Sequence, residues 1–277
     1  MKDLLAIVTP VSEKTLEPSA IYALSLARHM RARMTVMIAT IERFPAALGD
    51  PDNMQAYSGA GQSPSLDERR ARTADLMRSE AERAGVDYAI LTETDYSPSL
   101  GRMVTAAAQV RDLTLLGVHG PLAYPRQGLV EAALFGSGRP LLLIPQAAQP
   151  FSGGVIVIGW DATRAAVRAV HDALPLLIEA EKVVVASVSG DKELPVFASG
   201  SAICQYLEQR HVKASFNALT RQQKTVGEDL LAHARNLGAN LLVMGGFGRA
   251  REQEFLFGSA TRDIFQSHLE IPVLLSH

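Results

Sequence analysis

The sequence contains two copies of one strand–helix unit, and this repeat limits the possible folds more than any other feature. The apolar segment Leu4–Thr9 corresponds to Val155–Trp160. In each copy an alanine-rich segment with helical spacing and then a β-branched segment follow: Ala20–Met30 and Met34–Thr40 in the first, Ala165–Ile178 and Val183–Val188 in the second. Strands that alternate with helices at this spacing predict a parallel sheet covered by helices on both faces.

The later parts of the two copies also correspond. Leu113–Gly120 (LTLLGVHG) parallels Leu241–Gly248 (LLVMGGFG), and each copy closes on a proline and an apolar strand (PLLLIP and PVLLSH). We therefore expect an α/β protein with two tandem open parallel-sheet domains. The expected domains span residues 1–148 and 149–277, with Gln146–Gly154 as the linker.

Helical periodicity supports this arrangement and marks one exception. Val167, Val170, Leu174 and Leu177 share one face of a predicted helix in the second copy. Pro175 lies inside that helix and should kink or shorten it, because proline lacks an N–H and its ring clashes with the preceding turn.

Charge and cysteine content exclude several classes of protein. The net charge of the 277 residues is −2, so the chain has no global attraction to nucleic acid or to anionic membranes. The basic run Arg69–Arg72 is interleaved with acidic residues and indicates a solvated helix face. A single cysteine, Cys204, excludes an internal disulfide and a multi-cysteine zinc site, and its surroundings predict a helical core position or a half-buried one.

Hydropathy gives the expected location. No apolar run reaches the roughly 18 residues of a membrane span. The first residues form an apolar strand followed by polar residues rather than a signal peptide. We therefore expect no membrane association and a cytoplasmic location.

A glycine-rich stretch near the end of the second copy carries the strongest functional signal. After the apolar run ANLLVM come Gly245 and Gly248, then nine residues, then Gly258 and Ser259. Glycine permits a positive φ and lets backbone N–H groups approach an anion closely. A helix start after the loop adds unpaired N–H donors and the positive end of the helix dipole. The stretch therefore predicts a site for a phosphate-bearing small molecule.

Two common phosphate loops are excluded by the spacing. The Walker loop requires Gly-Lys-Ser/Thr, and no glycine in this chain precedes a lysine. The dinucleotide fingerprint requires G-x-G-x-x-G after the first strand of a unit. Gly246-Phe247-Gly248 continues with Arg249-Ala250-Arg251, so the third glycine is missing, and the loop follows a late strand instead.

The remaining pattern is similar to that of a known family. The spacing G-x-x-G, nine residues, G-S, shortly before a Pro-apolar strand, resembles the nucleotide-binding signature of the universal stress protein family. GANLLVMGG resembles the strand before that signature, and VIVIGWDAT resembles the family's first strand. The resemblance covers the whole chain as two tandem copies. It implies five strands in the order 3-2-1-4-5 in each copy, and ATP, alone or with Mg²⁺, as the ligand.

The resemblance also implies roles for individual residues of the second copy. Asp161 would accept hydrogen bonds from the adenosine, and the backbone of Val188 would lie beside adenine. Gly245 and Gly248 would let the loop wrap the ribose and phosphates. Backbone N–H groups, together with the serine hydroxyl, would bind phosphate oxygens at three further positions: Gly258, Ser259 and Ala260. Strands one and four are neighbours in this order, at the switch point where open α/β sheets bind ligands.

Some of these residues allow other interpretations. Asp161 could cap the next helix, a role that is compatible with ligand binding. Gly258 and Ser259 could form an ordinary helix entry. Arg249 and Arg251 are equally consistent with phosphate contacts and with solvated loop positions.

The first copy departs from the pattern. Gly117 and Gly120 preserve G-x-x-G, but the positions that match Gly258 and Ser259 hold Arg126 and Gln127. The first strand ends in Thr-Pro-Val, without an aspartate. We therefore predict that the first domain binds ATP poorly and has a structural role. His119, inside the first loop, has no second ligand at metal-like spacing and is expected to be a loop or core histidine.

Three functions stay open at this point. The leading hypothesis is a stress-linked regulator that binds ATP in the second domain, with no catalytic residue, no metal ligand and at most slow hydrolysis involving Glu252 or Glu254. The alternatives are an enzyme of the same nucleotide-binding superfamily and an interaction module without nucleotide. The apolar strands that close each copy favour pairing, either within the chain as a pseudo-dimer or between chains as a homodimer.

Overall fold

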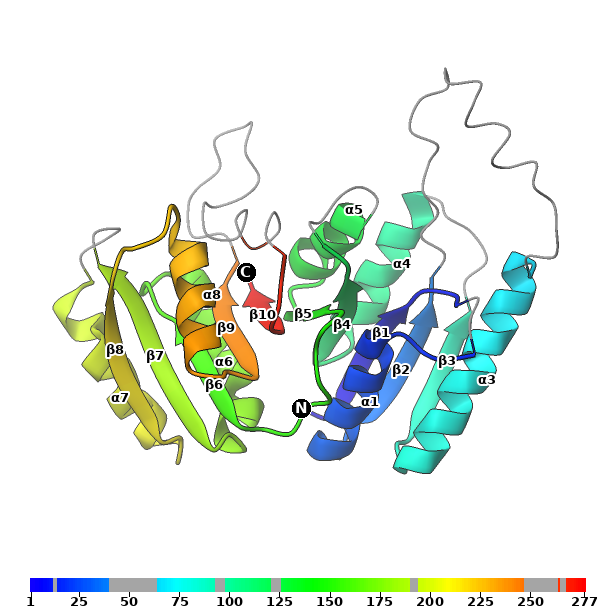
Figure 1. The fold of residues 1–277 in the computed structure, drawn as a ribbon, viewed down its shortest axis with the longest axis horizontal. Coiled ribbons are helices and arrows are strands. Elements are labelled where there is room, and N and C mark those ends of the chain that lie inside the picture. The colour runs from blue at the N-terminus through cyan, green and yellow to red at the C-terminus, as the bar shows by residue number, and fades with distance from the viewer. Residues whose placement is uncertain are drawn as a thin grey trace, which may run out of the picture.

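A computed structural model describes residues 1–11, 14–39, 64–92, 98–120, 126–189, 194–246, 264 and 268–277. Within these residues a single sheet of ten strands runs through the molecule, with helices on both sides (Figure 1). The first half contributes five strands: β1 (Asp3–Val8), β2 (Arg33–Ile38), β3 (Tyr88–Thr92), β4 (Leu113–Val118) and β5 (Leu141–Pro145). Its helices are α1 (Pro18–Met30), α3 (Leu66–Ala84), α4 (Pro98–Gln109), α5 (Arg126–Glu131) and the π-helical η1 (Ala132–Gly136).

The second half repeats this sequence of elements. Its strands are β6 (Val155–Gly159), β7 (Lys182–Ser189), β8 (Ala214–Thr220), β9 (Leu241–Gly245) and β10 (Val273–Ser276). Its helices are α6 (Arg164–Ile178), the short 3₁₀-helix η2 (Val196–Ala198), α7 (Gly200–Glu208) and α8 (Val226–Asn236). The strands and helices predicted within the described residues are present, mostly within one or two residues of the predicted bounds. The helix predicted after the glycine loop falls outside the described residues.

The order of strands is β3-β2-β1-β4-β5-β10-β9-β6-β7-β8. Each half therefore has the internal order 3-2-1-4-5, as predicted, and its five strands are parallel to one another. The two strands that were expected to seek pairing, β5 and β10, pair with each other in antiparallel orientation, with Leu274 opposite Leu142. This pairing joins the two five-stranded sheets into one continuous sheet.

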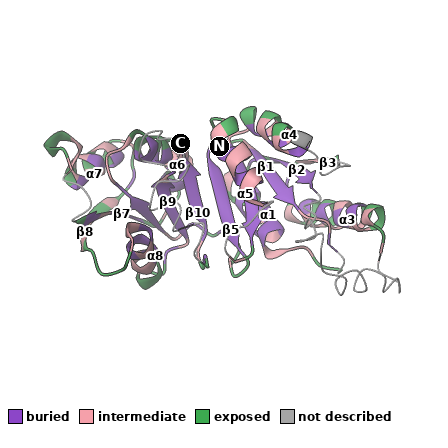
Figure 2. Cartoon of the chain, turned by 90° about the horizontal axis from the view of Figure 1, so that it is seen from above, coloured by how far each residue is buried: buried purple, intermediate pink, exposed green. Residues whose placement is uncertain are grey.

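Both faces of the sheet are buried except at the edge strands β3 and β8, which explains the apolar sequences of the inner strands. Successive residues of β1 alternate between two cores: Leu4 packs on the side of α1, α3, α6 and α7, and Leu5 packs on the side of α4, α5, η1 and α8. Seen from above, the strands are buried throughout the middle of the molecule and the exposed residues lie on the outer surfaces of the helices (Figure 2). A strand that is buried on both faces needs apolar residues at successive positions, without alternation between apolar and polar residues.

Two helices differ from the expectation. Pro175 does not shorten α6, which continues to Ile178. Val167 is 42% exposed, whereas the buried side of α6 consists mainly of alanines. In α3, Arg70 is buried rather than solvated, and its guanidinium lies 3.4 Å from the carboxylate of Asp67.

Among the described residues no helix is long and apolar enough to span a bilayer.

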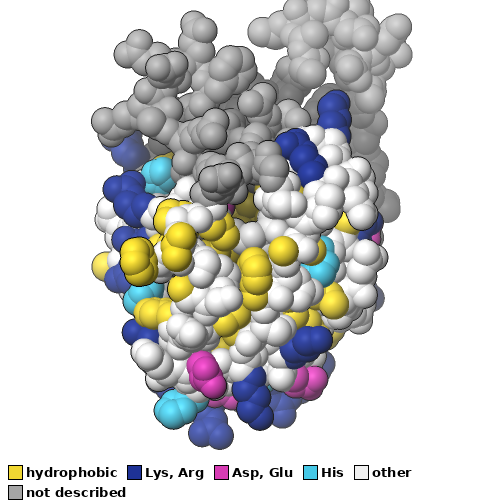
Figure 3. All heavy atoms as spheres, turned by 90° about the vertical axis from the view of Figure 1, so that its left-hand side faces the viewer, with side chains coloured by type: hydrophobic (Ala, Val, Ile, Leu, Met, Phe, Trp, Pro, Cys, Tyr) yellow, Lys and Arg dark blue, Asp and Glu magenta, His cyan; other side chains and the backbone are white. Residues whose placement is uncertain are grey.

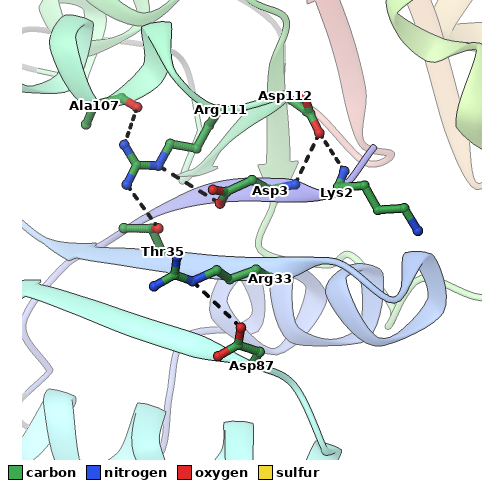
Figure 4. Close-up of polar contacts among 8 residues, drawn as sticks. All are labelled: Lys2, Asp3, Arg33, Thr35, Asp87, Ala107, Arg111 and Asp112. Carbon is green, nitrogen blue, oxygen red and sulfur yellow. Dashed lines mark hydrogen bonds and ion pairs between the residues drawn. The ribbon is translucent and has the colours of Figure 1, made fainter.

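Polar contacts hold the amino ends of the first-half strands together (Figure 4). Arg111 donates to the carbonyl of Ala107 at 2.9 Å and to the hydroxyl of Thr35 at 3.3 Å, and it lies 4.0 Å from the Asp3 carboxylate. Burial would raise the pKa of Asp112, but backbone hydrogen bonds from Lys2 and Asp3 outweigh it and hold that pKa below its ordinary value. These groups lie at the edge of the sheet opposite the carboxyl ends of the strands.

The segment between β5 and β6 is attached to the first half. Phe151 is only 7% exposed and packs edge-on against Tyr22 and His29 of α1, with ring centroids 6.0 and 5.1 Å away. Its backbone N–H donates to the hydroxyl of Ser25 at 2.6 Å. The expected linker therefore contributes to the core of the first half.

This packing predicts that Phe151→Ala destabilises the protein. Truncation of a buried phenylalanine leaves a cavity and should lower the free energy of unfolding by about 3 kcal/mol. Urea unfolding of wild type and variant measures the difference. Phe197→Ala is the matched control, because Phe197 is 98% exposed and its truncation should change the free energy by less than about 0.5 kcal/mol. Equal losses in the two variants would contradict an anchored linker.

Candidate functional site

The described candidate residues of the second half lie at the ends of three adjacent strands. Asp161 follows β6 by two residues, Gly245 ends β9, and Val188 is the penultimate residue of β7. Strand β6 lies between the other two and pairs in parallel with both. The connection from β6 to β7 runs through α6 on one face of the sheet, whereas the connection from β8 to β9 runs through α8 on the other face. The strand order therefore reverses at β6, and this is the switch point where open α/β sheets bind ligands.

Asp161 is held in a fixed turn at the entry to α6. Its Oδ1 accepts hydrogen bonds from the backbone N–H of Thr163 at 3.1 Å and from the Thr163 hydroxyl at 2.6 Å. The same hydroxyl oxygen caps the helix by accepting from the N–H of Ala166 at 3.2 Å. The helix cap is therefore Thr163, and Asp161 orients that cap instead of serving as the cap itself.

Gly245 is required by close packing. A Cβ at this position would lie 2.6 Å from the backbone nitrogen of Ala166 and 2.7 Å from the carbonyl carbon of Ala165. The φ of Gly245 is not positive, so conformational freedom is not the reason for the glycine. The absent side chain lets the end of β9 approach the first turn of α6, close to the Asp161 turn.

Val188 is buried and pairs with Leu219 of the edge strand β8. The other predicted ligand residues lie outside the described part of the chain: Gly248, Gly258, Ser259 and Ala260. The same holds for Arg249, Arg251, Glu252 and Glu254.

An apolar hollow lies beside the Asp161 turn. It has a volume of about 220 Å³ and is lined by Trp160 and Ala162, the two neighbours of Asp161, and by side chains of α6, η2 and α7. The indole N–H of Trp160 donates to the carbonyl of Ala198 at 2.9 Å, which fixes the wall of the hollow. Apolar side chains also gather on the face of the molecule that carries α7 and β8 (Figure 3).

The corresponding place in the first half is filled by its own charged side chains. Glu17, at the start of α1, accepts hydrogen bonds from the hydroxyl of Thr9 and from the hydroxyl of Ser19, the latter at 3.4 Å. Its Oε2 lies 3.6 Å from Nε2 of His119, which follows β4. His119 therefore has a carboxylate partner, as expected of a satisfied histidine.

Arg126 completes this first-half cluster. It occupies the position that matches Gly258, and its guanidinium donates to the carbonyl of Gly117 at the end of β4. Burial lowers the pKa of Arg126, and the charge of Glu17 opposes that shift. The long side chain thus occupies space beside the strand end, and the matching position in the sequence of the second copy is a glycine. Sequence comparison located Arg126 but missed Glu17, because Glu17 follows the first strand by nine residues.

The cluster determines the ionisation of Glu17. Burial alone would raise the pKa of its carboxyl, but the hydrogen bonds from His119 and Thr9 and the nearby charges of His119 and Arg126 outweigh burial and lower it. Glu17 is therefore a carboxylate at neutral pH.

Among the described residues no group of three or more His, Cys, Asp or Glu side chains could hold a metal ion. Cys204 lies half-buried on α7, as predicted, and burial raises the pKa of its thiol.

Comparison with known proteins identifies the fold. No protein-family model and no curated protein sequence matches the chain. A universal stress protein from Archaeoglobus fulgidus superposes with a TM-score of 0.66 at 13% identity, covering 98% of this chain and 95% of that one. A putative universal stress protein from Pseudomonas aeruginosa gives 0.62 at 17% identity, covering 99% and 92%. The cytoplasmic domain of a prokaryotic cation chloride cotransporter gives 0.50 at 11% identity, covering 99% and 94%.

These structures share the arrangement of the entire chain, including both halves. At such low identities the likeness establishes the fold and leaves ligand and activity to the site residues. The fold implied by the sequence resemblance is therefore confirmed.

The first-half cluster predicts a pH-dependent contribution of Glu17 to stability. A folded-state pKa below the ordinary 4.5 means that the contribution is fully present above that pH and is lost as the pH falls through the folded-state pKa. Glu17→Gln should lower the free energy of unfolding by about 1 kcal/mol at pH 7. The difference in free energy of unfolding between variant and wild type should become smaller toward pH 3.

Urea unfolding at several pH values measures this gap. Glu80→Gln is the matched control, because Glu80 forms an i,i+3 pair at 2.8 Å with Arg83, whose side chain is 70% exposed, and surface pairs contribute little. A gap for Glu17→Gln that stays constant from pH 7 to pH 3 would contradict the cluster.

Proposed function

We propose that this chain is a tandem universal stress protein that binds ATP, alone or with Mg²⁺, in its second half and acts as a stress-linked regulator. One observation carries the proposal: Asp161 and Gly245 lie at the ends of the neighbouring strands β6 and β9, in the half whose glycine loop is intact. The carboxylate that would meet the adenosine and the loop that would meet the phosphates thus start from the same switch point.

The described residues suggest how the adenosine would be recognised. The Asp161 carboxylate, oriented by Thr163, is a strong acceptor for ribose hydroxyls or the adenine amine. The apolar hollow bounded by Trp160 and Ala162 would accommodate a flat heterocycle next to that carboxylate. Gly248, Gly258, Ser259 and Ala260 would supply backbone N–H groups and a hydroxyl to the phosphates.

In this proposal the two halves have different roles. Residues 149–277 form the nucleotide-binding domain. Residues 1–148 form a domain whose corresponding place is taken by Glu17 and Arg126, so it serves as the structural partner in an intrachain pseudo-dimer. The site offers binding groups but no described general base, so regulation by occupancy fits better than rapid catalysis, in a cytoplasmic protein.

A role as a nucleotide-free interaction module is the second candidate. The likeness to the cytoplasmic domain of a cotransporter supports it, since the same fold there belongs to a domain of a larger membrane protein. The two candidates differ in one measurable property, the occupancy of the second-half site.

The ATP proposal predicts that the protein binds adenine nucleotide and that Gly248→Val abolishes binding, because the added branches would exclude the phosphates. Asp161→Asn should weaken affinity about tenfold while retaining the turn to Thr163. Isothermal titration with ATP, and analysis of small molecules released from freshly purified, denatured protein, measure both. Asp172→Asn, on the same α6 but away from the switch point, is the control and should bind like wild type. No released nucleotide and no titration heat with wild type would favour the interaction module.

A further inference from the structure

The glycine loop of the second half starts in contact with the first half. Gly246 directly follows β9, and a Cβ at this position would lie 3.2 Å from Cδ2 of Leu134, which belongs to η1 of the first half. The N–H of Gly246 donates to the carbonyl of Ser276 at 2.7 Å. The first residue beyond β9 is thus held between the adjacent strand of its own half and a helix of the other half.

His277 extends this contact. Its Nδ1 lies 3.2 Å from the carbonyl oxygen of Gly246, and because that oxygen can only accept, the ring nitrogen must donate. The ring of Phe135, also on η1, meets the imidazole edge-on with centroids 5.0 Å apart and an interplanar angle of 84°. An edge-to-face aromatic pair of this kind is directional and orients both rings.

The helix that carries Leu134 and Phe135 is itself firmly supported. The hydroxyl of Thr105 on α4 donates to the carbonyl of Ala132 at 3.0 Å, and a Cβ on Gly136 would lie 2.6 Å from the same hydroxyl oxygen. Leu134 is fully buried. The π-helical turn η1 is therefore locked against α4, and π-helical turns occur disproportionately at functional positions.

We propose that Phe135 is a positioning residue for the nucleotide site of the second half, acting through His277 on the backbone of Gly246. This inference rests on the proposed function, because it assumes that the second half binds ATP. It gives the first half a role in the affinity of that site, although the first half does not contain the site. Gly246 stands between Gly245, which packs on α6, and the loop residues predicted to hold phosphate. Gly246 is thus the last described residue before the stretch that is predicted to hold phosphate.

The test compares ATP affinity, by isothermal titration, across variants of the full-length chain. Phe135→Ala and His277→Ala should each weaken ATP binding by about fivefold or more. Phe135→Tyr retains the aromatic edge and should restore wild-type affinity. His277→Asn keeps a donor near the position of Nδ1 and should bind ATP more tightly than His277→Ala. If His277 only filled space, the Asn and Ala variants would have equal ATP affinity.

The matched control is another contact between the halves that does not involve Gly246. Arg168 of α6 donates to the carbonyl of Gly138 at 2.7 Å, and Arg168→Ala should leave ATP affinity unchanged. If Arg168→Ala weakens binding as much as Phe135→Ala, general loosening of the junction explains the effect and the inference is overturned. Wild-type affinity in both Phe135→Ala and His277→Ala overturns it as well.

Failure of the proposed function has a different signature. If wild type itself shows no ATP binding, the nucleotide site is wrong and the positioning role falls with it. If wild type binds ATP and the η1 variants bind equally well, only the positioning role is wrong. Because the His277 variants alter a side chain at the end of the sheet, they test the inference even if Phe135→Ala fails to fold.

Discussion

The antiparallel pairing of β5 with β10 is the contact on which the architecture depends. Each of these strands closes one half, and each would otherwise present a row of unpaired N–H and C=O groups flanked by fully apolar side chains. Joining them removes both edges at once and leaves β3 and β8 as the outer strands of the sheet. The same pairing brings η1 of the first half beside Gly246 and His277 of the second, so the first residue beyond β9 lies at the junction of the two halves.

The two halves place different groups at the carboxyl ends of their strands. In each half, the first glycine of G-x-x-G lets its strand approach the start of a helix. Gly245 of β9 approaches Ala166 of α6, and Gly117 of β4 approaches Ser19 of α1. In the first half, Glu17, His119 and Arg126 then satisfy one another in the space beside the strand end. In the second half, the described groups are an oriented carboxylate and an apolar hollow, which are features of a binding site.

Much of this fold was predictable because the repeat and the hydrophobic patterns are local signals. The strands, the helices and the order within each half follow from the sequence and its family resemblance, and Cys204 lies where expected. The exposure of Val167 and the burial of Arg70 were not predictable, since both depend on which neighbour covers a helix face. The shortening of α6 at Pro175 was predicted from the missing N–H of proline, but the helix continues to Ile178.

The candidate site was less accessible to sequence reasoning. Asp161 and Gly245 could be named from their motif, but their packing roles toward Thr163 and Ala166 required coordinates. Glu17 had no signal, because a glutamate before a helix is ordinary and its partners come from three separate segments. The contact of Phe135 with His277 arises only from the pairing of the two halves, which a linear sequence does not display.

Arg126 can be regarded as a ligand that never dissociates. It is covalently part of the chain, so its effective concentration beside β4 is set by geometry and does not change with conditions in the cell. A duplicated protein with two open sites would report ligand concentration over two linked binding steps. Under the proposed function, with one place permanently filled from within, the single remaining site would give a simple saturation curve, and the duplicated half would contribute rigidity without a second response to the same ligand.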